Sequence, residues 1–255
     1  MFEHELAFAN GLTDRAADIG MGLFLGDALE VRHKADRTVV TQADTSIEAM
    51  VREQVAAAFP EDHVLGEEEG GADRATGRVW IVDPIDATAN FARGIPIWAT
   101  LIALQVDGEL VMGLVGAPAI GERYEAVRAG GARMNGRPIR VSAVDDLSDA
   151  HVLHAESAWL GRAGGSGAAG VLSTAARTRG FGDFWGHVLV ARGAAEAMLE
   201  PELNIWDYAA LQVVVEEAGG RVTQLDGSPT RHGGSMLSTN HVLHDEVLER
   251  LAGSD

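Results

Sequence analysis

The chain contains no cysteine. This absence excludes disulfide bonds, a thiolate nucleophile and zinc sites built on sulfur ligands. Positive charge is also scarce, because 20 Lys and Arg residues stand against 38 Asp and Glu residues and the formal net charge is −18. Nucleic-acid binding depends on cations that neutralise phosphates, so this balance argues against a nucleic-acid partner. It suits a protein that binds cations, although a high acid content also serves simply as a solubilising surface.

Long apolar runs are missing from the sequence. No run approaches the roughly 20 residues that span a bilayer, so we expect no membrane partner. The first residues, Met1 to Glu5, have neither the basic nor the apolar region of a secretory signal, and we therefore expect a cytoplasmic protein. With 255 residues, 46% of them hydrophobic, the chain can bury a core as one large domain or as two small, closely packed ones.

Apolar periodicity predicts an α/β chain. Asp44 is expected to cap the second helix, and residues 161–170 read as a Gly/Ala/Ser loop. After Asp146 the pattern changes to helix–strand alternation. This change predicts an N-terminal α+β subdomain over 1–146 and a C-terminal α/β subdomain over 147–255. We expect helices over 3–30, 44–59, 171–178, 184–192, 208–218 and 244–251, and strands over 79–82, 99–106, 110–115, 124–127, 139–141, 151–154, 195–199 and 221–225.

A strand-like run, Trp80 to Val82, leads into Asp83-Pro84-Ile85-Asp86. Side chains three residues apart cannot both point the same way from a straight strand, but a turn after Asp83 brings both carboxylates around one cation. Mg²⁺ prefers oxygen ligands, and two or more such ions can activate water, clamp a phosphoryl group and stabilise the leaving alkoxide. In the alternative interpretation, each Asp only caps nearby backbone N–H groups.

Three further segments have both a functional and an ordinary interpretation. The backbone from Ala87 to Asn90 opens a helical turn whose N–H groups suit a phosphate, or forms a plain loop capped by Thr88. Glu67 follows a glycine, where the backbone bends freely, yet it also begins a run of acids typical of a solvated loop. Asp207 precedes a helix and is an obvious N-cap candidate. Their joint order and spacing therefore matter more than any one of them.

The segments Gly66-Glu67-Glu68, Asp83-Pro84-Ile85-Asp86-x-Thr88-x-Asn90-Phe91 and Trp206-Asp207-x-Ala209-Ala210 together resemble the inositol monophosphatase family. Members of that family are Mg²⁺-dependent, lithium-sensitive phosphomonoesterases. The resemblance extends over essentially the whole chain. Within the family, residues 94–104 and 180–185 are most similar to bacterial histidinol-phosphatases of the actinobacterial type.

The resemblance implies a layered αβαβα sandwich, a homodimer and two or three Mg²⁺ ions. It implies direct hydrolysis of L-histidinol phosphate to L-histidinol and phosphate, a step of histidine biosynthesis, by an in-line water and without a phosphoenzyme. Alternative substrates are inositol monophosphate, fructose bisphosphate and a nucleotide 3′-phosphate; a catalytically silent metal- or phosphate-binding protein is a further alternative. The implied metal ligands are Glu67, Asp83, the Ile85 carbonyl, Asp86 and Asp207; Glu67, Thr88 and Asp44 act on the water; Ala87, Thr88, Asp183, Glu200 and Asp207 contact the phosphate or substrate.

Two residues depart from the family pattern. Ala87 stands where the family usually has glycine, and a positive φ there would cost roughly 1 kcal/mol or more. We expect a helical φ, which makes Ala87 harmless. Ala89 stands where histidinol-phosphatases commonly have lysine, so one positive charge near the phosphate is lost.

Histidinol phosphate carries an ammonium and an imidazole, so its site should offer carboxylates away from the metals. Asp183 is such a candidate, because a buried acid needs a cationic partner; alternatively it caps the helix that follows. Glu200 contacts a substrate hydroxyl in inositol phosphatases and does not discriminate by itself. Asn240 is expected to line the same pocket, whereas Trp98 and Trp185 are expected in the core or an interface.

Overall fold

The computed structural model describes residues 2–26, 29–33, 38–71, 76–155, 165–230 and 233–253. Its larger sheet has seven strands in the order β3-β4-β5-β6-β7-β8-β9. β3 and β4 are parallel, and each later pair is antiparallel. The strands are β3 (His63–Gly66), β4 (Arg78–Asp86), β5 (Ala99–Val106), β6 (Glu109–Ala117), β7 (Glu122–Val127), β8 (Gly131–Met134) and β9 (Arg137–Pro138).

The smaller sheet has five strands in the order β11-β10-β12-β14-β13. β10 runs parallel to both of its neighbours, and β14 runs antiparallel to β12 and β13. The strands are β10 (His151–His154), β11 (Arg177–Arg179), β12 (Ala197–Leu203), β13 (Arg221–Thr223) and β14 (Gly234–Thr239). A separate hairpin joins β1 (Val31–His33) to β2 (Val39–Thr41).

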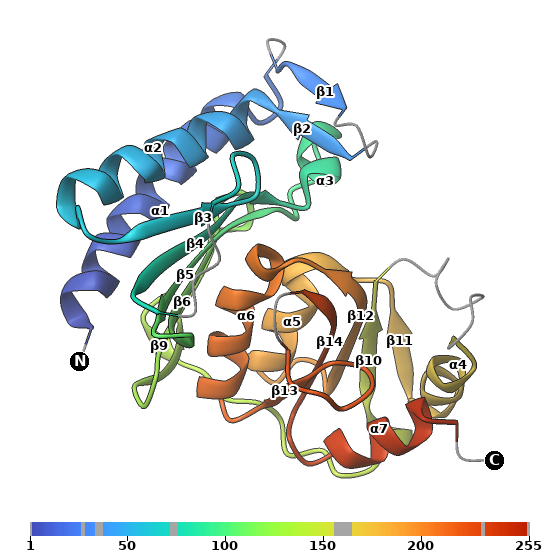
Figure 1. Cartoon of the computed structure of the whole chain (residues 1–255). Helices are drawn as coiled ribbons and strands as arrows, with labels where there is room; N and C mark the ends of the chain where they lie inside the picture. Colours follow the sequence, from blue (N-terminus) through green and yellow to red (C-terminus); the bar gives the residue numbers. More distant parts are fainter. Residues whose placement is uncertain are drawn as a thin grey trace.

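Helices form three layers around the two sheets (Figure 1). α1 (Glu3–Leu23) and α2 (Gln42–Ala58) cover the outer face of the large sheet, and α5 (Asp183–Ala191) and α6 (Ile205–Glu217) lie between the sheets. α4 (Gly165–Thr174) and α7 (His244–Leu251) cover the outer face of the small sheet. The expected αβαβα sandwich is therefore confirmed. Among the described residues, no helix is long and apolar enough to cross a membrane.

Alternation along β4 explains why this sheet is covered on both faces. Val79 and Ile81 join the core shared with α5 and α6, whereas Trp80 and Val82 join the core shared with α1 and α2. All four are buried, as a strand between two helical layers requires. Because α6 packs on β5 and β6, the chain's second half contributes directly to the core of the first. The division into 1–146 and 147–255 stays a prediction.

Several predicted elements differ in the structure. The first helix ends at Leu23 rather than near 30, and residues 139–141 form no strand. Residues 177–179 form strand β11, although the periodicity predicted a helix reaching 178. Strand β14 was not predicted, because Gly234 to Thr239 mixes small, polar and apolar residues.

The predicted loop over 161–170 is wrong for its described part. Residues 161–164 lie outside the described residues, and helix α4 begins at Gly165. The glycine-rich composition was a misleading signal, because Gly167 is needed for packing. A Cβ on Gly167 would collide with the backbone of Leu251. The glycine thus permits close contact between α4 and α7 rather than marking a loop, and Ala168 and Val171 bury the same helix in the core.

Candidate metal-binding and catalytic site

A β-bulge at the end of β4 brings two carboxylates together. Asp83 pairs with Leu101 and Asp86 with Ala99, so β4 has one more residue than β5 between these pairs. The extra residue breaks the two-residue alternation of the strand, which lets side chains three positions apart turn toward the same side. Thr100 supports the bulge by donating its hydroxyl to the Pro84 carbonyl at 2.8 Å.

Asp83, Asp86 and Asp207 form a compact acidic group. Each offers a carboxylate oxygen that lies within 4.8 Å of the other two. Asp83 and Asp86 are 2% and 7% exposed, and the Oδ1 atom of Asp83 is buried without a hydrogen bond. Asp207 comes from α6 and lies 121 positions after Asp86 in the chain (207 − 86). The group therefore joins the end of a strand to the start of a distant helix.

Burial and mutual repulsion raise the pKa of all three carboxyl groups. For Asp83, burial raises the pKa well above the ordinary value, and the charges of Glu67, Asp86 and Asp207 add to it. Burial likewise raises the pKa of Asp86 strongly and that of Asp207 to about 7. Three carboxylates this close cannot all ionise without a compensating cation. The donor set, all oxygen, fits a hard divalent ion such as Mg²⁺.

Asp207 and Asp44 occupy equivalent positions in their helices. Each accepts a backbone N–H from the residue three positions earlier, Asn204 at 2.6 Å and Thr41 at 2.8 Å. The prediction that these aspartates are N-caps was therefore wrong, because Asn204 and Thr41 precede the helices in that role. A carboxylate at the third helical position uses one oxygen to close the turn and keeps its second for other contacts.

Asp44 and Thr88 meet beside the acidic group. The Thr88 hydroxyl lies 3.2 Å from Asp44 Oδ1 and 2.9 Å from the Ile85 carbonyl, so its single proton can be donated to either. Asp44 is fully buried, which raises its pKa, although the hydrogen bonds from Thr41 oppose that rise. The structure thus brings together a buried carboxylate and a hydroxyl that sequence reasoning assigned to the attacking water.

Glu67 lies in the turn after β3 and donates its backbone N–H to Val82 at 3.2 Å. It does not belong to the group whose oxygens lie within 4.8 Å of one another. Its charge nevertheless raises the pKa of Asp83, Asp207 and Asp44. Its role as a metal ligand or catalytic group stays a prediction.

Ala87 has the left-handed conformation, with φ 65° and ψ 45°. The expectation of a helical φ was therefore wrong. Ala87 closes the turn that begins α3 (Thr88–Ala92), because its carbonyl accepts the N–H groups of Asn90 and Phe91 at 2.9 and 3.1 Å. This conformation costs a residue with a Cβ about 1–2 kcal/mol, so Ala87 keeps a glycine-like backbone at the expense of strain.

A cavity of 610 Å³ opens beside the acidic group. Asp183 and Glu200 both line it, from the start of α5 and the middle of β12. Glu200 is buried, whereas Asp183 is exposed, so the expectation of a buried acid at position 183 was wrong. Ala87 and Ala89 also line it, so a lysine at position 89 would stand in this cavity. His154, which the sequence did not single out, also contributes. The other lining residues are Asn90, Ile95, Ile97, Ala155, Gly180, Phe181, Gly182 and Trp185.

Asp183 does not cap the following helix. It is the first residue of α5 and has a positive φ of 57°, while the N-cap position is Gly182. The Phe184 N–H is bound instead by Asp86 Oδ2 at 2.8 Å. This bond ties the acidic group to the wall of the cavity, and the N-cap position of α5 belongs to Gly182 rather than Asp183.

One other expectation for this cavity is wrong, and another is only half of what the structure shows, because Trp185 packs against the core and also lines the cavity. Asn240 lies away from it, because its side chain contacts Ser142 and Val144 at 3.1 and 2.8 Å. Asn240 follows β14 and donates its backbone N–H to Glu196 at 2.9 Å, just before β12, whereas Glu200 lies in the middle of that strand. Trp98 is buried against Phe91 as expected, whereas Trp185 lines the cavity and packs its ring on Phe181.

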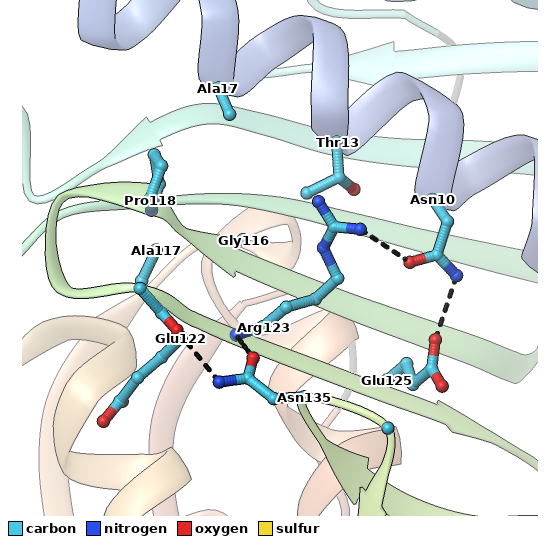
Figure 2. A pocket seen from close by; sticks show the side chains of 12 residues that line it. Asn10, Thr13, Ala17, Gly116, Ala117, Pro118, Glu122, Arg123, Glu125 and Asn135 are labelled. Atoms are coloured by element: carbon cyan, nitrogen blue, oxygen red, sulfur yellow. Dashed lines mark hydrogen bonds between the residues drawn. The ribbon is translucent and has the colours of Figure 1, made fainter.

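A second cavity, of 530 Å³, lies between α1 and the β6–β7 turn (Figure 2). Its polar side chains bind one another, since Asn10 contacts both Arg123 at 3.2 Å and Glu125 at 2.9 Å. Arg123 also pairs with Asp14. Within the described ranges, the acidic group lies at the other cavity, so we place the candidate site there.

Comparison with known proteins identifies the family of the chain. The family model described as the inositol monophosphatase family matches residues 3–254. The histidinol-phosphatase of Mycobacterium tuberculosis is 45% identical over 98% of this chain and 99% of its own length. That of Streptomyces coelicolor is 42% identical over 96% and 95%. The crystal structure of the extragenic suppressor protein SuhB from Bartonella henselae superposes with a TM-score of 0.91 at 27% identity, covering 99% of this chain and 100% of that one.

Proposed function

The chain belongs to the inositol monophosphatase family, and we propose that it catalyses Mg²⁺-dependent hydrolysis of L-histidinol phosphate to L-histidinol and phosphate. The acidic group of Asp83, Asp86 and Asp207 is the observation on which the proposal rests. The substrate assignment is supported by relatives of that activity, which match nearly the whole chain. The reaction would be a step of histidine biosynthesis.

In this proposal, Glu67, Asp83, Asp86, Asp207 and the Ile85 carbonyl hold two or three Mg²⁺ ions. When bound, the ions lower the pKa of water and neutralise charge on the phosphoryl group and the leaving oxygen. The buried Asp83 Oδ1, which has no hydrogen bond, is the atom that most needs such a partner. We further propose that the protein is a homodimer, which sedimentation analysis of the purified protein would test. We also propose that it is cytoplasmic.

Thr88 and Asp44 would move the proton of the attacking water. When Thr88 donates to Asp44 Oδ1, its oxygen is free to accept a proton from a water beside it. Burial raises the pKa of Asp44 and makes this carboxylate a better final acceptor. Glu67, next to both Asp44 and Asp83, would orient the same water, and the backbone N–H groups of Ala87 and Thr88 would hold phosphate oxygens.

The cavity favours a cationic substrate over a neutral sugar. Asp183 and Glu200 both line it, and Ala89 adds no positive charge to oppose them. Ammonium and imidazolium groups form charge-assisted hydrogen bonds with carboxylates, which are stronger than those between neutral groups. Inositol monophosphate is the second candidate, supported by family membership and by the hydroxyl-binding role expected for Glu200.

Phosphate release from a panel of substrates tests the proposal. The panel contains L-histidinol phosphate, inositol 1-phosphate, fructose 1,6-bisphosphate and adenosine 3′,5′-bisphosphate, each with Mg²⁺ and with EDTA. We expect an EDTA-sensitive preference for L-histidinol phosphate. Metal-dependent turnover of another member would retain the mechanism and reject the substrate, and no turnover of any would favour a silent binding protein.

A further inference from the structure

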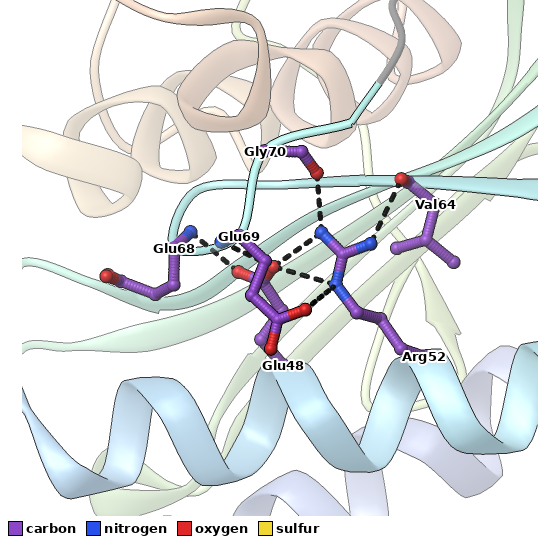
Figure 3. Close-up of polar contacts among 6 residues, drawn as sticks. All are labelled: Glu48, Arg52, Val64, Glu68, Glu69 and Gly70. Carbon is purple, nitrogen blue, oxygen red and sulfur yellow. Dashed lines mark hydrogen bonds and ion pairs between the residues drawn. The ribbon is translucent and has the colours of Figure 1, made fainter.

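Glu48 is a buried carboxylate at the contact between α2 and the loop that carries Glu67 (Figure 3). Its side chain is fully buried. It accepts the backbone N–H groups of Glu68 at 2.7 Å and Glu69 at 3.0 Å. It also accepts from Arg52, at 2.6 Å from Nη2 and 2.9 Å from Nε. Both oxygens are therefore engaged, and Glu48 holds the loop rather than a cation.

The glycine that precedes Glu67 has its explanation here. A Cβ on Gly66 would collide with the carboxyl group of Glu48, and Gly66 does not have a positive φ. The sequence reasoning that glycine lets this backbone bend freely was therefore wrong about the cause. Glycine stands before Glu67 because the Glu48 carboxylate occupies the space of its side chain.

Arg52 closes the same loop from the other end. Its guanidinium donates to the carbonyls of Gly70 at 2.5 Å and Val64 at 3.3 Å. The loop itself is tied across its base, where the Gly66 N–H donates to Gly70 at 3.1 Å. Together these bonds fix the backbone on both sides of Glu67.

Asp44, Glu48 and Arg52 are spaced four residues apart on α2, so they lie along one side of the helix. Asp44 contacts Thr88, and Glu48 one turn later contacts the loop of Glu67. One rigid helix thus sets the position of Thr88 relative to Glu67. These are the two groups that must converge on the attacking water.

We propose that Glu48 is a positioning residue that holds Glu67 in the place from which it binds a divalent cation. This inference rests on the proposed function, in which Glu67 is a metal ligand. Groups that orient a metal ligand typically change metal affinity or activity by about 10–100-fold when removed. The contribution of Glu48 would therefore appear in metal binding and not only in the stability of the fold.

The variant Glu48→Gln tests this inference. Glutamine has nearly the same shape, but its NH₂ group would face a backbone N–H donor or the Arg52 guanidinium, and the ion pair is lost. We expect its dissociation constant for Mn²⁺, measured from free Mn²⁺ by electron paramagnetic resonance, to rise about 10-fold or more. The measurement reads the metal directly and does not depend on turnover.

Glu196→Gln is the matched control. Glu196 is also a buried carboxylate, 6% exposed, that accepts a backbone N–H, from His151 at 2.6 Å. It lies before β12, at the opposite end of that strand from the cavity. A general effect of losing a buried carboxylate would lower the melting temperature of both variants, whereas only Glu48→Gln should lose Mn²⁺ affinity.

Wild-type Mn²⁺ affinity in folded Glu48→Gln would overturn the positioning role, as would an equal loss in both variants. If Glu48→Gln does not fold, Arg52→Met replaces it, because Arg52 is partly exposed and its loss loosens the same loop. Weaker Mn²⁺ binding by Arg52→Met supports the inference, and unchanged binding refutes it. A wild-type protein that binds no Mn²⁺ would instead refute the proposed function, and the positioning role with it.

Discussion

Replacing Ala87 by glycine should relieve strain at the start of α3. Ala87 has φ 65° and ψ 45°, a conformation that costs a residue with a Cβ about 1–2 kcal/mol. Glycine removes this cost but adds about 0.4–1 kcal/mol of freedom to the unfolded chain. It also gives up one partly buried methyl group, worth at most about 0.8 kcal/mol. The net effect on the free energy of unfolding is therefore about +0.4 kcal/mol at the centre of these ranges, with limits of about −0.8 and +1.6 kcal/mol.

Ala89 provides the control in the same helix. It is exposed and has no positive φ, so Ala89→Gly should lose about 0.5–1 kcal/mol, as glycine does in a helix. At the centre of both ranges the two variants should thus differ by about 1 kcal/mol. For a chain of this size, 1 kcal/mol corresponds to about 2–4 °C in melting temperature.

Thermal unfolding in EDTA, followed by circular dichroism, measures this difference without a contribution from bound metal. We expect Ala87→Gly to melt at or above the wild-type temperature and Ala89→Gly below it. Equal destabilisation by both substitutions would refute the strain argument, because it would mean that Ala87 tolerates its backbone as an ordinary helical residue does. Phosphate release by Ala87→Gly should stay near wild type; a very large gain would favour the silent interpretation of the natural sequence.

Three further predictions concern the acidic group and the cavity. Asp83→Asn should raise the melting temperature in EDTA, because it removes a buried charge that repels its neighbours. The same variant should lower metal-dependent phosphate release by about 100-fold or more, since one ligand is worth several kcal/mol. Raised carboxyl pKa values, that of Asp207 to about 7, mean that the acidic group binds more protons in the folded metal-free protein than in the unfolded chain above pH 4. Burial lowers the pKa of His187 to about 3 and that of His244 to about 4, and these two groups act in the opposite direction below about pH 7. The melting temperature of the wild type in EDTA should therefore fall relative to that of Asp83→Asn, which keeps both histidines, as pH rises from 5 to 8, and Mg²⁺ should reverse the fall; a difference that does not change with pH would contradict the raised pKa of Asp83. Asp183→Asn should lower kcat/KM for L-histidinol phosphate by about 10–100-fold, as expected when a charged hydrogen bond is lost, and affect inositol 1-phosphate far less; equal losses on both would remove Asp183 from substrate selection.

The sequence predicted the strands and helices that have strong apolar periodicity. The local spacing of apolar residues was enough to predict strand β4 and helix α6. It also predicted the carboxylates of Asp83 and Asp86 as a pair, because their separation on a strand demands a turn. It could not predict the bulge that supplies this turn, because the bulge depends on pairing with β5. Nor could it locate the true N-caps, since Thr41 and Asn204 are recognised only once the helix ends are known.

The sequence reasoning failed where backbone conformation or long-range contact decides. The left-handed φ of Ala87 could not be predicted from the local sequence, because alanine favours helices. The only indication was that the family usually has glycine at this position. Glu48 was missed because an acid on an amphipathic helix is usually solvated. The four-residue spacing of Asp44, Glu48 and Arg52 indicated a shared side of the helix. The loop that Glu48 and Arg52 contact, however, begins 14 residues after Arg52 in the chain (66 − 52).

Most of these features destabilise the metal-free folded chain. The site combines three crowded carboxylates, a buried carboxylate oxygen without a hydrogen bond, and positive φ values at Ala87 and Asp183. Each lowers the stability of the folded chain when no cation is bound. Glu48 acts in the opposite direction, because its four hydrogen bonds stabilise the loop next to the repulsive group. A divalent cation would relieve the repulsion but not the backbone strain. Metal binding should therefore stabilise this protein most at high pH, where the carboxylates are ionised, and least at acidic pH, where protons already neutralise them.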